Sequence, residues 1–121
     1  MSKQALIVDD SRSASSALAD LLTLLDFEAT IANGSRDAVE KLASLTPDLI
    51  ILDVNMPGVT GLEVAAFVRR EPRTAHVPII IVSGATQPVS VVRQIREGGY
   101  KFLAKPVTSE ALEEALKEVM G

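Results

Sequence analysis

The sequence is poor in cysteine and in aromatic residues, and each shortage excludes a class of site. Its 121 residues include no cysteine, so disulfide bonds and thiolate metal sites are both excluded. There is no tryptophan, and the chain has one tyrosine and three phenylalanines, which argues against the aromatic platforms on which single-stranded nucleic acids stack. A metal site in this chain therefore has to rely on oxygen and nitrogen ligands.

Blocks of basic residues and long apolar runs are also missing. The net charge is -4, and the densest basic feature is the doublet Arg69-Arg70, so we expect no direct binding to nucleic acid. The apolar runs are far shorter than the roughly 20 residues of a membrane-spanning helix. A strand is predicted within the first few residues, which leaves no room for a signal peptide. We therefore expect a cytoplasmic protein that does not bind membranes.

Short apolar runs alternate with stretches of helical periodicity, and this alternation predicts an α/β fold with a parallel sheet. Its length predicts one domain over residues 1–121. Residues 49–52 and 77–82 are nearly continuous apolar runs, which is typical of central strands covered on both faces. The predicted strands lie near 4–9, 27–32, 49–52, 77–83 and 100–104. The predicted helices lie near 11–25, 35–44, 61–71, from Pro88 to the Gly98-Gly99 pair, and near 108–119. Ala38, Val39 and Leu42 are expected to face inward on the second helix, and Thr60 and Glu63 have the spacing of a capping box for the third.

Polar residues follow four of these runs directly. They are Asp9-Asp10, Asp53, Ser83 and Lys105-Pro106. Because the carboxyl ends of parallel strands share one edge of a sheet, we expect three carboxylates, a hydroxyl and an ammonium to meet in one pocket. Each segment alone is ordinary turn chemistry, since Asp, Ser, Pro and Gly are common in loops. Their joint occurrence at four different strand ends favours a functional site.

The charges of this pocket indicate a divalent cation and a phosphoryl group. Three carboxylates and one ammonium sum to -2, and like charges about 4 Å apart repel by about 4 kcal/mol at an effective dielectric constant near 20. Oxygen-only ligands favour Mg²⁺, which shares its shell with phosphate. Lys105 is suited to bind a phosphoryl group as a point charge, and Ser83 can donate to one of its oxygens. Asp53 stands alone after a central run and is the better nucleophile by position.

Together these residues resemble the receiver domain of two-component response regulators, the CheY-like family. The resemblance spans the whole chain and rests on residues 8–11 (VDDS), 52–58 (LDVNMPG) with Gly61, 82–85 (VSGA) and 102–106 (FLAKP). It implies a flavodoxin-like (βα)5 three-layer sandwich whose five-stranded parallel sheet has the order 2-1-3-4-5. It also implies a signalling protein that catalyses only its own phosphotransfer and slow autodephosphorylation, and is otherwise no enzyme.

The resemblance further implies a role for each site residue. Asp53 would be the phosphoacceptor, with a histidine kinase or a histidine phosphotransfer protein as the donor. Asp10, Asp53 and the backbone carbonyl of Asn55 would bind Mg²⁺ directly, and Asp9 would act through a metal-bound water. Lys105 would pair with the phosphoryl group, and Ser83 would move to hydrogen-bond it.

In the same family, an aromatic residue and a cis peptide bond accompany the switch. Phe102 matches the aromatic residue that turns inward, although an ordinary core position in the fifth strand is an equal alternative. The Lys105–Pro106 bond would be cis. The output surface for a downstream protein or an attached output domain would be the fourth helix, fifth strand and fifth helix. That surface would carry or adjoin Arg93, Arg96, Glu97 and Lys101. For most of these residues, an ordinary solvated surface charge is an equally good interpretation.

Two positions after Ser83 depart from the family's general pattern. Gly84 has no side chain, which would loosen the loop. Ala85 offers no acid or amide to position a hydrolytic water, so we expect a phosphorylated form that is not unusually short-lived.

Three rival functions are weighed against this interpretation. A flavodoxin-like cofactor protein needs a phosphate-binding loop where this chain has Asp9-Asp10, which would repel phosphate without a metal. An aspartate-nucleophile phosphatase carries its nucleophile and a second Asp two residues later after the first strand, whereas here Asn55 stands two residues after Asp53. A degenerate receiver that only binds partners would not need the full set of phosphorylation residues that this sequence contains.

Overall fold

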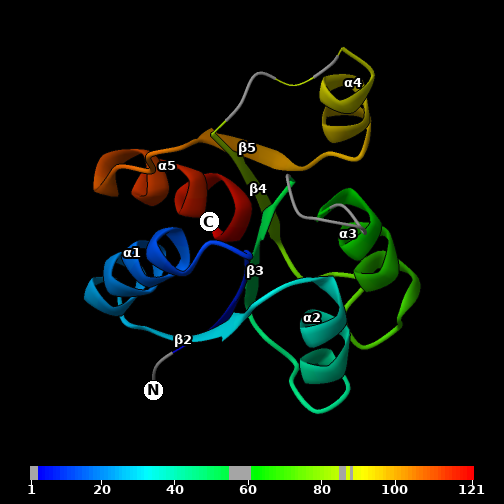
Figure 1. Cartoon of the computed structure of the whole chain (residues 1–121), viewed down its shortest axis with the longest axis horizontal. Coiled ribbons are helices and arrows are strands. Elements are labelled where there is room, and N and C mark those ends of the chain that lie inside the picture. Colours follow the sequence, from blue (N-terminus) through cyan, green and yellow to red (C-terminus); the bar gives the residue numbers. More distant parts are fainter. Residues whose placement is uncertain (1–2, 55–60, 85–86, 88) are drawn as a thin grey trace.

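The computed structural model describes residues 3–54, 61–84, 87 and 89–121, and in these ranges five strands alternate with five helices (Figure 1). The strands are β1 Lys3–Val8, β2 Phe27–Ala32, β3 Leu49–Asp53, β4 Ile79–Ser83 and β5 Lys101–Ala104. The helices are α1 Arg12–Leu24, α2 Ser35–Leu42, α3 Gly61–Arg70, α4 Val89–Glu97 and α5 Ser109–Met120. The strands pair in parallel in the order β2-β1-β3-β4-β5, which confirms the predicted fold.

Helices cover both faces of the sheet, with α1 and α5 on one side and α2, α3 and α4 on the other (Figure 1). Alternate residues of each central strand enter opposite cores. Leu6 and Ile50 pack in the cluster that includes residues of α2, α3 and α4, whereas Ile7 and Ile51 pack with residues of α1 and α5. All five residues of β3 are buried, as are all five of β4, which is the outcome predicted for central strands.

The local sequence explains where several elements begin. Helix α1 follows Ser11, whose Oγ accepts a hydrogen bond from the backbone N–H of Ala14, and α5 follows Thr108, which caps its helix in the same way. Strand β4 starts at Ile79 rather than at the predicted residue 77, because Pro78 has no N–H to donate to a neighbouring strand. Thr60, predicted to cap α3, and Pro88 lie outside the described residues.

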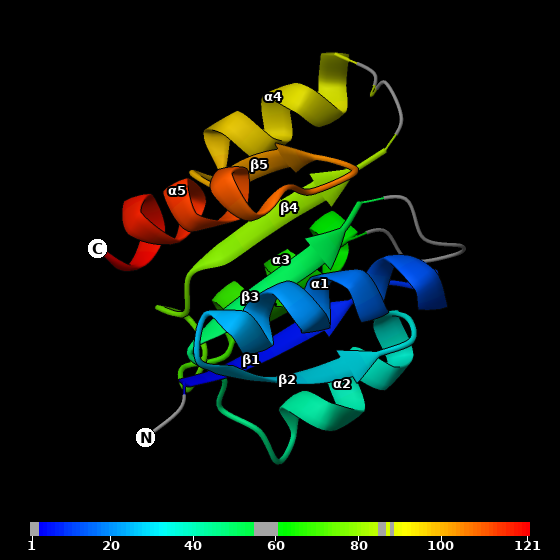
Figure 2. The same cartoon turned by 90° about the vertical axis from the view of Figure 1, so that its left-hand side faces the viewer.

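All five strands point the same way, so their carboxyl ends lie along one edge of the sheet (Figure 2). The register brings the ends together closely. Asp53 pairs with Val82 and Ser83 pairs with Ala104, so the last residues of three neighbouring strands stand almost level. The described helices include none with the length and hydropathy needed to cross a membrane.

Candidate functional site

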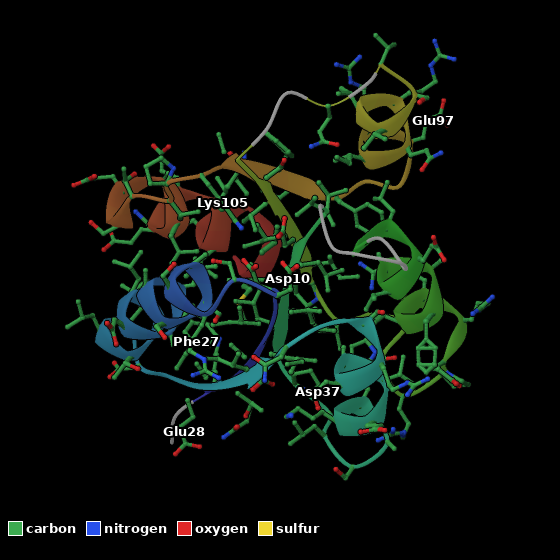
Figure 3. All side chains as sticks on the ribbon, in the orientation of Figure 1. Asp10, Phe27, Glu28, Asp37, Glu97 and Lys105 are labelled. Atoms are coloured by element: carbon green, nitrogen blue, oxygen red, sulfur yellow. The ribbon has the colours of Figure 1, made fainter. Side chains whose placement is uncertain are left out.

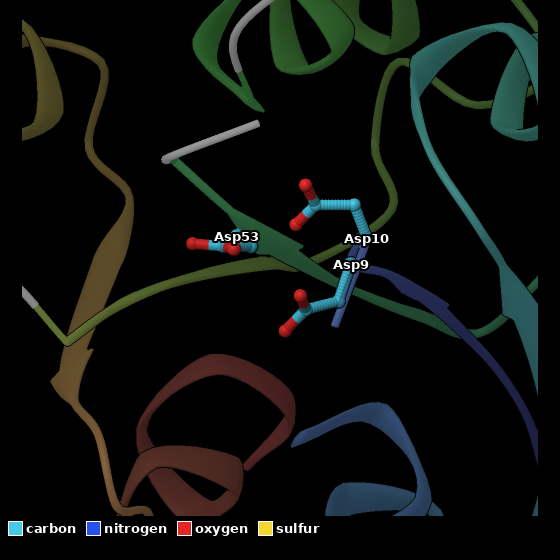
Figure 4. Close-up of side chains that lie close together, drawn as sticks. All are labelled: Asp9, Asp10 and Asp53. Carbon is cyan, nitrogen blue, oxygen red and sulfur yellow. The ribbon is translucent and has the colours of Figure 1, made fainter. Parts of the chain in front are cut away.

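Three carboxylates gather at the carboxyl ends of β1 and β3 (Figure 4). Asp9, Asp10 and Asp53 each offer an oxygen, and these oxygens lie within 4.8 Å of one another. Asp9 and Asp53 are buried, whereas Asp10 is exposed. Two oxygens on opposite sides of a Mg²⁺ ion are about 4.1 Å apart, so the cluster has the dimensions and the hard oxygen donors that a divalent cation needs. The three acids therefore form a pocket that can hold a metal ion, and the ion can enter from the side of the exposed Asp10.

The Asp9 carboxylate is already engaged through both of its oxygens. Its Oδ1 accepts a hydrogen bond from the backbone N–H of Ser11 at 2.9 Å, and its Oδ2 accepts one from Nζ of Lys105 at 2.8 Å. The residue is 1% exposed, and burying a carboxylate is costly unless it has such hydrogen-bond partners. Asp9 thus anchors the lysine and the start of the loop that leads into α1.

Lys105 follows β5 directly and connects two of the acids. Its Nζ lies 2.8 Å from Asp9 Oδ2 and 3.3 Å from Asp53 Oδ2. Burial by itself would lower the pKa of Lys105, but the hydrogen bond to Asp9 and the charge of Asp53 outweigh it and raise the pKa. Figure 3 shows the labelled side chains of Lys105 and Asp10 near the centre of the view. The Lys105–Pro106 bond is cis, the isomer that the family resemblance implied.

Ser83 is the last residue of β4 and is buried. Its backbone carbonyl accepts a hydrogen bond from the backbone N–H of Lys105 at 2.9 Å, which ties the end of β4 to the start of the loop that follows β5. Its side-chain Oγ accepts a hydrogen bond from Nε2 of Gln87 at 2.7 Å. Sequence reasoning did not single out Gln87, because an amide in a loop carries no signal until the fold shows which group it meets.

Glycine is required at the start of α3. A Cβ added to Gly61 would lie 2.2 Å from the backbone oxygen of Asp53 and 3.1 Å from the Cα of Val54. The helix therefore packs directly on the backbone of the central acid, and any larger residue would push the two apart. At Gly84, by contrast, a Cβ would meet the Lys105 side chain at an ordinary 3.5 Å.

The predicted switch residue, Phe102, points outward. It is 41% exposed, whereas its neighbour Leu103 is buried. Phe102 lines a groove of about 410 Å³ between α4 and β5, together with Val92, Ile95, Arg96, Tyr100 and Lys101. Lys101 forms an ion pair with Glu118 of α5 at 2.6 Å, which ties β5 to that helix.

The structure thus brings together Asp9, Asp10, Asp53 and Lys105, and it places Ser83 at the end of the neighbouring strand. Phe102 lies apart from them, on the outer side of β5 beside α4. Two of the residues to which the sequence analysis gave roles, Asn55 and Ala85, lie outside the described residues.

A family model for the response regulator receiver domain matches residues 5–117. The chain belongs to this family. The match includes all four strand-end segments, so the acidic cluster and Lys105 lie in the part of the chain that defines the family. Receiver domains are signalling proteins of two-component systems, and this assignment excludes the flavodoxin and phosphatase alternatives.

Individual relatives agree with the family assignment. The chain is 33% identical over 120 residues to the chemotaxis protein CheY of Thermotoga maritima, covering 98% of both chains. It is 28% identical to the polar-differentiation response regulator DivK of Brucella ovis, covering all of this chain and 98% of that protein. The solved structure of Vibrio cholerae CheY4 superimposes with a TM-score of 0.88 at 31% identity, covering 98% of this chain and 99% of that chain.

Other relatives are much longer. The regulatory protein LuxO of Vibrio cholerae is 32% identical over 106 residues, which cover 88% of this chain but 23% of LuxO. The family therefore includes both proteins about as long as this chain and larger regulators that contain a receiver domain as one part.

Proposed function

We propose that this receiver domain accepts a phosphoryl group on Asp53 from the phosphohistidine of a histidine kinase or a histidine phosphotransfer protein. The observation that carries the proposal is the position of Asp53, which ends the central strand β3 with Lys105 Nζ 3.3 Å from its Oδ2. In the reaction a carboxylate oxygen of Asp53 forms a bond to phosphorus while the phosphorus–nitrogen bond of the donor breaks. The imidazole nitrogen leaves with the electron pair of that bond.

The site residues suit Mg²⁺ as the resident cation. Asp10 and Asp53 would bind it directly, together with the backbone carbonyl of Asn55, which lies outside the described residues. Because both oxygens of Asp9 already accept hydrogen bonds, Asp9 is better placed to act through a metal-bound water. When bound, the ion supplies positive charge that offsets the carboxylates and the incoming phosphoryl group.

Lys105 and Ser83 would provide the remaining contacts to the phosphoryl group. The raised pKa of Lys105 keeps its ammonium charged, as pairing with a phosphoryl oxygen requires. Ser83 would approach and donate its hydroxyl hydrogen to a second oxygen. Phosphorylation exchanges one negative charge on Asp53 for about two, and this change draws both groups toward Asp53.

The conformational response would reach the surface through Phe102. Its outward position in this structure fits the unphosphorylated state, and phosphorylation would turn it inward as Ser83 moves. The groove that Phe102 lines between α4 and β5 would then change shape. The surface of α4, β5 and α5 would thereby control a downstream protein or an attached output module.

Residues 1–121 would act as a single receiver domain that catalyses only its own phosphotransfer and slow autodephosphorylation. Ala85, which offers no group to position a hydrolytic water, still predicts a phosphorylated form that is not unusually short-lived. A cytoplasmic location remains a prediction.

Mass spectrometry after incubation with Mg²⁺ and a small phosphodonor such as acetyl phosphate tests the function. We expect the wild type to gain the mass of one phosphoryl group. Asp53→Asn should gain none, whereas Asp20→Asn, the same substitution at an exposed position of α1, should label like the wild type. An unlabelled wild type, or equal labelling of Asp53→Asn, would disprove the proposal and favour a receiver that only binds partners.

A further inference from the structure

The hydrogen bond between Gln87 and Ser83 joins the end of β4 to the segment just before α4. Nε2 of Gln87 donates to Ser83 Oγ at 2.7 Å, and helix α4 begins two residues after Gln87. The distance is at the short end of the range for N–H···O hydrogen bonds. Ser83 is 2% exposed and Gln87 is partly buried, so the bond is shielded from water on the serine side.

This contact holds the hydroxyl group that the proposed function requires to move. Ser83 Oγ accepts from Gln87, so a shift of the serine toward Asp53 has to lengthen the Ser83–Gln87 contact or carry the Gln87 side chain with it. Gln87 follows Ser83 by four residues, precedes the first residue of α4 by two, and lines a small pocket together with Val89 and Val92 of that helix. Breaking the contact is therefore the simpler outcome, since carrying Gln87 along would also displace the helix.

We propose that Gln87 is a positioning residue that holds the Ser83 hydroxyl in its resting place, so that phosphorylation exchanges the Gln87 hydrogen bond for one to the phosphoryl group. This inference rests on the proposed function. It adds to it a residue that sets the balance between the resting and activated states. A bond present in the resting state alone stabilises that state, and its loss shifts the population toward the activated one.

Beryllofluoride with Mg²⁺, a non-covalent mimic of the phosphoryl group, measures this balance directly. Its dissociation constant can be followed through backbone amide chemical shifts at constant Mg²⁺. Gln87→Met removes the donor and keeps a side chain of similar length. We expect it to bind beryllofluoride about 2- to 12-fold more tightly, which corresponds to a net hydrogen bond of about 0.5–1.5 kcal/mol at about 1.4 kcal/mol per tenfold.

A double-mutant cycle distinguishes the hydrogen bond from a general effect on the loop. In a Ser83→Ala background the partner is absent, so Gln87→Met should leave the affinity unchanged. Gln94→Met makes the same substitution at an exposed position of α4 and should match the wild type. Should Gln87→Met lack the wild-type circular dichroism spectrum, Gln87→Ala replaces it in the same cycle.

Each result has a definite meaning. Equal or weaker binding by Gln87→Met would overturn the inference, because Gln87 would then not favour the resting state. Tighter binding that persists in the Ser83→Ala background would overturn it as well, since the effect would not pass through the serine. If the wild type itself fails to bind beryllofluoride, the proposed function fails and this inference falls with it. If the wild type binds beryllofluoride but the double-mutant cycle shows no coupling between Gln87 and Ser83, only the proposed role of Gln87 is rejected.

Discussion

Lys105 lies closer to Asp9 than to Asp53, with Nζ 2.8 Å from Asp9 Oδ2 and 3.3 Å from Asp53 Oδ2. The ammonium thus bridges a supporting acid and the proposed phosphoacceptor. Because its shorter contact is with the supporting acid, Lys105 can keep its contact with Asp9 while, under the proposed function, its ammonium pairs with a phosphoryl group on Asp53. The same bridge offsets part of the negative charge that the three carboxylates concentrate at one edge of the sheet.

Removal of the Lys105 charge should destabilise the protein when no metal is present. In Lys105→Met, the buried carboxylate of Asp9 loses its cation, and we expect the free energy of unfolding at neutral pH to fall by about 1–3 kcal/mol. Saturating Mg²⁺ should stabilise this variant more than it stabilises the wild type, because the ion replaces the missing charge. Urea denaturation with and without Mg²⁺ measures both effects. The same loss in Lys117→Met, on α5, would contradict a site-specific cause.

The Lys105 bridge also predicts a pH dependence at alkaline pH. Its pKa is raised in the folded protein above the ordinary value of 10.5, so the unfolded chain releases the proton first. The stabilisation is fully present below about pH 10.5 and is lost as the pH rises through the folded pKa. The difference in unfolding free energy between the wild type and Lys105→Met should therefore be constant from about pH 7 to 9 and shrink above pH 10.5. A difference that disappears already near neutral pH would contradict the raised pKa.

The Asp10 carboxylate should lower the stability of the metal-free protein and should be required for the stabilisation of the protein by Mg²⁺. Neutralising this exposed acid in Asp10→Asn removes repulsion within the cluster, and we expect a gain of about 0.5–1 kcal/mol without metal. Stabilisation by Mg²⁺ should largely disappear. Thermal unfolding with a Mg²⁺ titration tests both points. Asp20→Asn is the matched control and should keep the full stabilisation by Mg²⁺. An equal loss of that stabilisation in Asp20→Asn would show that the ion acts on surface charge in general.

Gly61→Ala should disrupt the site through the backbone. The added Cβ would meet the backbone oxygen of Asp53 at 2.2 Å, so α3 and the end of β3 have to separate. We expect a loss of about 1–3 kcal/mol in unfolding free energy. Gly84→Ala places its Cβ at 3.5 Å from Lys105 and should cost less than about 1 kcal/mol. Equal stability of the two variants would show that the close approach at Gly61 is relieved by small shifts.

Asp26 adopts a left-handed backbone conformation with φ of 67°, where glycine is favoured. Asp26→Gly should raise the unfolding free energy by about 0.5–1 kcal/mol. Asp20→Gly should lower it by about 1 kcal/mol, because the same change falls inside helix α1. Chemical denaturation of both variants provides the comparison, and a loss of stability in Asp26→Gly would refute the argument.

Phe102→Trp should report the proposed switch, since the chain contains no other tryptophan. The aromatic side chain at this position is 41% exposed in the resting structure, so its fluorescence should be quenched readily by iodide. Addition of Mg²⁺ and beryllofluoride should shift the emission to shorter wavelengths and reduce the quenching. The change should vanish when Asp53→Asn is added. Emission that does not respond in a protein shown to bind beryllofluoride would count against Phe102 as the switch.

Much of this protein can be predicted from the order of residues. Nearly continuous apolar runs at 49–52 and 77–82 indicate central strands because a strand covered on both faces needs no alternation. A polar residue directly after each run marks the site because parallel strands end at one edge. Helix faces are less certain from periodicity alone. Val39, expected to face inward on α2, is 39% exposed, because the short helix buries only a narrow stripe.

Other features depend on distances that only the folded chain sets. Lys105 lies closer to Asp9 than to Asp53 because β5 ends beside β4 and the Lys105 side chain reaches across to the end of β1. Asp9 at that end is 96 residues away from Lys105 in sequence. The Gln87–Ser83 hydrogen bond depends on how the chain leaves β4, which composition does not encode. Strand order and residue types thus determine which groups meet. Register and loop path decide which atoms touch, because hydrogen bonds and ion pairs depend on differences of a few tenths of an ångström.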